Sequence, residues 1–156
     1  MGELDRALVH LQACLAWYGD LGSALIRREA LPELAWALLA VGDLPQAQRY
    51  FAQALTVFRR AGMRRHVAWC LEGMASAAAQ SVPHAAPRLW GAAAALRDRL
   101  GAPMWPVDRP EYEQRVAACR VALGDAAFDA AWAAGQALTW EQAVDAALAA
   151  LGSTAS

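Results

Sequence analysis

Residues 35–54 of this chain read AWALLAVGDLPQAQRYFAQA and contain a complete turn between two expected helices. Gly42 ends the first helical pattern, and Pro45 falls in the first turn of the next, where its missing N–H would be unpaired in any case. Alanines four residues before and three residues after Phe51 lie on the same helical face, so two helix axes can approach while the ring fills the gap between them. These residues predict an antiparallel helical hairpin.

The second half of this hairpin recurs along the chain at spacings of 40 and 39 residues. In each copy a small residue is followed four positions later by a large apolar one, and each copy ends at a glycine. The equivalent small residues are Ala7, Ala47 and Ala86, and the terminal glycines are Gly22, Gly62 and Gly101. Between the copies, residues 23–41 and 64–80 have apolar side chains at helical spacing. Stacked antiparallel helix pairs are therefore expected.

The composition supports an all-α fold. The 156 residues include 40 alanines and 20 leucines but one isoleucine, so strong helix formers dominate and β-branched residues are scarce. The length suits one domain with its own core. We expect a helical repeat region over residues 1–104 and, within the same domain, a C-terminal helical cap over residues 105–156.

Two short helices are expected within that cap, at about 110–123 and 126–134, with Gly124 and Gly135 as their stop signals. A third helix follows, with its apolar face directed toward the repeats. The residue pairs Asp108 with Glu111 and Thr139 with Gln142 have the spacing of capping boxes, which predicts helix starts at both places.

The chain resembles two known protein groups. Small and aromatic residues at Ala35, Gly42, Ala47, Phe51 and Ala54 look like a tetratricopeptide repeat, although the period exceeds the typical length of about 34 residues. Residues 64–151 also resemble the end of the helical repeat region in LuxR-type and related signal-transduction ATPase regulators of bacteria. The motifs that carry this second resemblance are Trp69–Ala75, Ala86–Ala93, Ala131–Gly135 and Thr139–Val144. It implies a tetratricopeptide-like superhelix that serves a regulatory protein.

Several function classes are disfavoured by charge and composition. A formal net charge of −1 lacks the basic excess of a nucleic-acid binder, and the chain contains no lysine with which to build a phosphate-binding P-loop. No catalytic or metal-ligand motif is present, so we expect neither enzymatic activity nor a metal or cofactor. Three widely spaced cysteines and the lack of a membrane-length apolar run favour a cytoplasmic protein.

Four residues are candidates for contacting a ligand: Glu29, Trp36, Arg65 and Trp69. They lie on the two helices expected to line a concave groove, where exposed tryptophans would act as recognition anchors. Burial in the core is nevertheless the favoured interpretation for both tryptophans, because large apolar residues are usually buried. Arg65 belongs to a basic cluster around Gly62 that fits either helix-end electrostatics or docking of an acidic peptide.

The helix expected at residues 3–21 has a wider apolar face than one neighbouring helix can cover. In the 40-residue register it takes the second position of a pair whose first member is missing. We expect Leu4, Leu8 and Leu11 to form an interface, covered by preceding chain of a longer protein or by a second copy around a two-fold axis.

These observations favour a non-catalytic module that binds a protein, a peptide or a small effector within a bacterial regulator. Two alternatives stay open. One is a structural spacer without a ligand of its own, and the other is a small helical enzyme with a pocket between the repeats and the cap.

Overall fold

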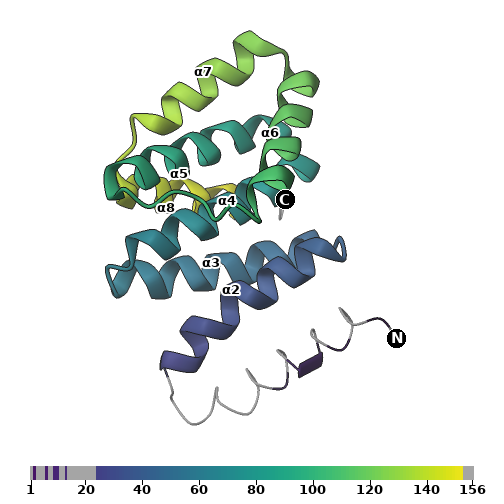
Figure 1. Cartoon of the computed structure of the whole chain (residues 1–156), viewed down its shortest axis with the longest axis vertical. Helices are drawn as coiled ribbons and strands as arrows, with labels where there is room; N and C mark the ends of the chain where they lie inside the picture. The colour runs from purple at the N-terminus through teal and green to yellow at the C-terminus, as the bar shows by residue number, and fades with distance from the viewer. Residues whose placement is uncertain (1, 3–5, 7–8, 11–12, 14–23, 153–156) are drawn as a thin grey trace.

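The computed structural model describes residues 2, 6, 9–10, 13 and 24–152 (Figure 1). The regular elements within residues 24–152 are α-helices and one short 3₁₀ helix, with no strand among them, which confirms the all-α fold. The elements are α2 (Ala24–Ala40), α3 (Leu44–Arg60), α4 (Arg64–Ser81), η1 (Pro83–Ala85), α5 (Ala86–Leu100), α6 (Arg109–Leu123), α7 (Asp125–Gln136) and α8 (Trp140–Gly152). The helices predicted at 23–41, 64–80, 110–123 and 126–134 are confirmed to within about two residues at each end.

One type of turn ends α2, α3 and α5. Gly42, Gly62 and Gly101 have φ values of 82°, 66° and 56°, in the left-handed region that glycine adopts without a steric penalty. After Gly62, the N–H of Met63 donates to the carbonyl of Phe58 at 2.9 Å, and Gly42 and Gly101 are followed by the equivalent bond. This is the Schellman arrangement, and it confirms the predicted stop signals at these glycines.

The first hairpin is held by a side-chain cap as well. The Asp43 carboxylate accepts a hydrogen bond from the Gln46 N–H at 3.2 Å, and Pro45 lies in the first turn of α3 as predicted. Phe51 is buried between α3 and α4, where its ring lies directly over Gly73. Because Gly73 has no side chain, the two helices approach closely at this point.

Successive helices from α2 to α5 pack against one another in chain order, and α7 packs against α5 on its other side (Figure 1). The last helix departs from this order. It turns back to contact α3, α4 and α5, with Val144 and Ala147 fully buried. The Arg59 guanidinium on α3 donates to the Asp145 carboxylate at 2.5 Å, and Arg64 lies over the Trp140 ring.

One prediction about the cap was wrong, and another was confirmed only in part. Gly135 does not end α7, which continues to Gln136; instead, Gly135 lies against the Arg88 carbonyl of α5, so its missing side chain permits close helix packing. The helix start predicted at Asp108 is confirmed, since α6 begins at Arg109, but the Asp108 side chain makes no capping hydrogen bond because its own backbone is already helical. The capping box of Thr139 and Gln142 is confirmed by its two reciprocal hydrogen bonds, of 2.9 and 3.2 Å.

Candidate functional site

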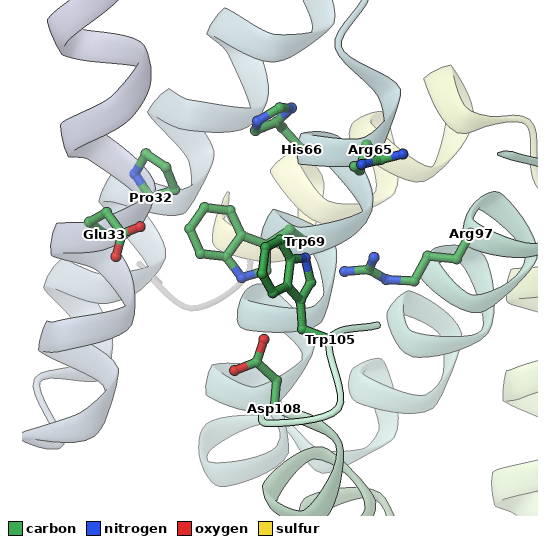
Figure 2. A pocket seen from close by; sticks show the side chains of 8 residues that line it. All are labelled: Pro32, Glu33, Arg65, His66, Trp69, Arg97, Trp105 and Asp108. Carbon is green, nitrogen blue, oxygen red and sulfur yellow. The ribbon is translucent and has the colours of Figure 1, made fainter. Parts of the chain in front are cut away.

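Two adjoining pockets of about 400 and 420 Å³ lie between α2, α4 and the segment that connects α5 to α6. Glu33, Trp69 and Asp108 line both, so the pockets form one depression, which we call the aromatic groove (Figure 2). The first pocket is completed by Pro32, Arg65, His66, Arg97 and Trp105. The second is completed by Trp36, Ala40, Glu72, Met104, Glu111, Tyr112 and Arg115.

Two half-buried tryptophans from neighbouring helices form the wall of the groove. The rings of Trp36 on α2 and Trp69 on α4 are stacked, with centroids 6.3 Å apart and an interplanar angle of 24°. Behind them, the rings of Phe51 and Trp36 are nearly perpendicular, with centroids 5.4 Å apart, so the turn that aligns α2 with α3 also fixes the position of the groove. The indole Nε1 of Trp36 is buried and has no hydrogen-bond partner within the described part of the chain.

The floor of the groove contains a buried ion pair. Arg97 Nε and Nη2 donate to the two carboxylate oxygens of Glu72 at 2.5 and 2.8 Å, and Arg97 Nη1 donates to the Ala102 carbonyl at 3.2 Å. The Glu72 side chain is only 4% exposed, and this burial raises the pKa of its carboxyl, although Arg97 offsets part of the rise. The paired geometry fixes α4 against α5 directly beneath the tryptophans.

Tyr112 joins α6 to this floor. Its ring is nearly perpendicular to that of the fully buried Trp90, with centroids 6.2 Å apart. Burial raises the pKa of the Tyr112 hydroxyl, and the nearby Glu72 carboxylate raises it further. The hydroxyl therefore stays protonated at neutral pH, so this side of the groove presents a neutral donor and acceptor.

An arginine from α6 closes the side of the groove next to α2. The Arg115 guanidinium lies 5.8 Å from the centre of the Trp36 ring and also donates to the Glu111 carboxylate at 2.5 Å. A cation over an aromatic face is attracted to the negative face of the ring. This contact shows that the groove already accommodates a guanidinium on one of its tryptophans.

The opposite rim is more exposed. Trp105 is 69% exposed on the connection between α5 and α6, and Asp108 lies next to it. Figure 2 shows both facing the pocket together with Glu33, while His66 and Arg65 lie across Trp69 from Asp108. The His66 ring also packs on the buried Phe58, with the two ring centroids 4.9 Å apart.

The structure brings three of the four predicted contact residues together. Trp36 and Trp69 stack on each other, and Arg65 shares the first pocket with Trp69. Glu29 lies within α2, but its side chain is outside the described residues. The predicted interface residues Leu4, Leu8 and Leu11 also lie outside the described residues.

Sequence reasoning missed Trp105, Asp108 and the pair of Glu72 with Arg97. Trp105 had a local signal, since it is a large apolar residue between two prolines in a connection without helical periodicity. The ion pair had none, because its partners are 25 residues apart and meet only when α4 packs on α5.

Comparison with known protein families, with curated proteins and with solved structures found no match to this chain. Across the described ranges, no three His, Cys, Asp or Glu side chains lie close enough to hold a metal ion. Of the helices that the structure describes, none has the length and apolar character needed to cross a membrane.

Proposed function

We propose that this chain is a non-catalytic recognition module that binds an extended peptide or a small effector in the aromatic groove. The observation that carries the proposal is the stacked pair of Trp36 and Trp69, both of which are only partly buried and line the groove. Large aromatic side chains that line a concave surface are the usual anchors of recognition sites.

The fixed geometry around the tryptophans supports this role. The buried pair of Glu72 and Arg97, the Schellman turn at Gly42 and the buried Phe51 all hold α2 and α4 in place. A groove that is already formed requires little ordering when a ligand binds, so more of the contact energy is available as affinity. The setting within a bacterial regulator, with a tetratricopeptide-like superhelix, is part of the same proposal and rests on the sequence resemblance alone.

For the enzyme alternative, Glu72 is the candidate acid, because it lines the second pocket and burial raises the pKa of its carboxyl. Both of its oxygens already accept hydrogen bonds from Arg97, so they are poorly placed to exchange a proton with a substrate. The contacts therefore favour a structural role for this group.

A thermal-shift screen against peptides and metabolites tests the proposal, because a ligand of the folded state raises the unfolding midpoint by mass action. We expect at least one ligand to raise the midpoint of the native protein and to lose this effect in Trp69→Ala. Trp140→Ala is the matched control, since it removes a half-buried tryptophan of α8 that lines neither pocket. A ligand that stabilises the native protein and Trp69→Ala equally, or no ligand at all, would favour the structural spacer.

A further inference from the structure

The aromatic groove pairs cations with carboxylates and tryptophans in a repeated pattern. At one place Arg115 lies over Trp36 and pairs with Glu111. Beneath it, Arg97 is held by both oxygens of Glu72. Each of these two guanidinium groups is thus already engaged by an acid of the same chain.

A second place in the groove has two tryptophans and a carboxylate, but no guanidinium is stacked on either ring. Trp69 and Trp105 line the first pocket, and Asp108 faces the same space (Figure 2). Among the residues that the structure describes, no arginine lies over either ring, and Asp108 forms no ion pair. The pocket leaves about 400 Å³ beside these groups, which is room for a long side chain and its neighbours.

The charge next to Trp105 favours a cationic occupant. Beside Trp105, the lining of the first pocket has the carboxylate of Asp108, which forms no ion pair among the described residues, and the guanidinium of Arg65. Figure 2 shows Arg65 across Trp69 from Asp108, so its positive charge lies away from the carboxylate. The positive charge of Arg97 is balanced by Glu72, with which it forms a bidentate pair.

From this arrangement we infer that the groove binds an extended peptide segment through an arginine side chain, with its guanidinium against Trp69 and Trp105 and paired with Asp108. The inference rests on the proposed function and names the chemistry of its ligand. Arginine fits better than lysine, because a planar guanidinium can stack on a ring and pair with a carboxylate at the same time. The peptide backbone continues past Trp69 into the second pocket, toward Tyr112.

Calorimetric titration of the whole chain with three blocked peptides tests the inference. The probes are acetyl-Ala-Leu-Xaa-Leu-Ala-amide with arginine, glutamine or glutamate at Xaa. We expect the arginine peptide to bind about tenfold more tightly than the glutamine peptide, which is the size of effect that a partly desolvated cation over an aromatic ring provides. The preference should weaken as salt is added, since the carboxylate is exposed.

Asp108→Asn should bring the affinity for the arginine peptide to that for the glutamine peptide. Asp98→Asn is the matched control, because Asp98 is an exposed acid on α5 that lines neither pocket, and the tenfold preference should persist there. Asp108 makes no side-chain cap, so its replacement removes no hydrogen bond of the fold, and circular dichroism of the variant checks that the helices are intact.

The other outcomes separate this inference from the proposed function. Tighter binding of the glutamate peptide, lost in Arg65→Gln, would identify an acidic ligand and overturn the inference while the recognition role stands. The inference is likewise overturned, and the recognition role kept, if none of the three peptides binds but a ligand in the thermal-shift screen depends on Trp69. If neither experiment finds a ligand that depends on Trp69, both the inference and the proposed function are wrong.

Discussion

The buried ion pair of Glu72 with Arg97 determines how firmly the groove is held. Two ions that are removed from water lose hydration free energy, and their attraction only roughly offsets this loss, so such a pair adds little net stability. Breaking the pair is destabilising, because it leaves one buried charge without a partner. Arg97 also binds the Ala102 carbonyl and so fixes the start of the connection that carries Trp105. The pair therefore serves to position the groove more than to stabilise the chain.

A non-additive double-mutant cycle is expected for this pair. Arg97→Met should lower the free energy of unfolding by about 3–5 kcal/mol, because Glu72 is left buried without its partner. Glu72→Leu combined with Arg97→Met should recover most of that loss, since no charge is then buried. Urea unfolding followed by circular dichroism measures both changes. Equal losses in the single and the double variant would contradict a mainly positioning role for the pair.

Cys70 should make the stability of the folded chain depend on pH in the alkaline range. It is fully buried beside Glu72, and burial first, then the neighbouring carboxylate, raises the pKa of its thiol. The native protein therefore keeps this proton at a pH where the unfolded chain, with a thiol pKa of about 8.5, releases it. Stability is thus expected to fall as the pH rises above that value, at up to about 1.4 kcal/mol per pH unit for this group.

Cys70→Ala should remove this contribution, so the difference in unfolding free energy between the variant and the native protein should shrink steadily from pH 8 to pH 10. The packing lost with the sulfur shifts the variant by a constant amount and leaves the slope unaffected. Urea unfolding at a series of pH values measures it. Parallel pH profiles for the two proteins would show that the thiol is not protected by burial.

Among the elements, the close contact of α5 with α7 depends on two glycines, Gly91 and Gly135, which have no side chain. A Cβ at Gly91 would overlap the Trp132 carbonyl of α7, just as one at Gly135 would overlap the Arg88 carbonyl of α5. These glycines lie inside helices and lack a positive φ, so they are present for close packing and not for a turn. In the sequence they cannot be told apart from stop signals, which is why the prediction for Gly135 is wrong.

Gly91→Ala should therefore destabilise the chain by about 1–3 kcal/mol through overpacking, even though alanine is the better helix former by about 1 kcal/mol. Thermal and urea unfolding provide the measurement. Gly124→Ala is a useful comparison, because its Cβ meets open space and only the φ of 81° is strained. Stabilisation by Gly91→Ala would mean that helix propensity outweighs the contact and that α5 and α7 are not closely packed at this point.

In the molecule as a whole, α8 ties the helix pairs to one another. In a stack where each unit contacts only its neighbours, a local change stays local. Here Val144 is buried where α8 meets α3, α4 and α5, so we expect Val144→Ala to cost about 1–3 kcal/mol. Hydrogen exchange should then accelerate in α3 as well as in α5. Faster exchange confined to α8 would show that α8 does not couple them.

The sequence predicted local features well and long-range ones poorly. Helix ends at Gly42, Gly62 and Gly101 followed from nearby residues, because a Schellman turn needs only a glycine and the preceding turn of helix. The return of α8 and the pairing of Glu72 with Arg97 depend on which helices meet, and apolar periodicity identifies a buried face without naming its partner. Trp36 and Trp69 were selected by helix position, whereas Trp105 and Asp108 required the path of the connection after α5.

The central claim is that ligands bind at Trp69 and Trp105, and the indole N–H signals in a ¹⁵N–¹H spectrum test it most directly. The chain has seven tryptophans. Trp69→Phe and Trp105→Phe assign the two signals of the groove, and the signals of Trp132 and Trp140 serve as internal references. Titration with the arginine peptide should shift the two groove signals progressively and leave the references in place. Shifts at Trp132 or Trp140 with unchanged signals from Trp69 and Trp105 would place binding elsewhere and contradict the claim.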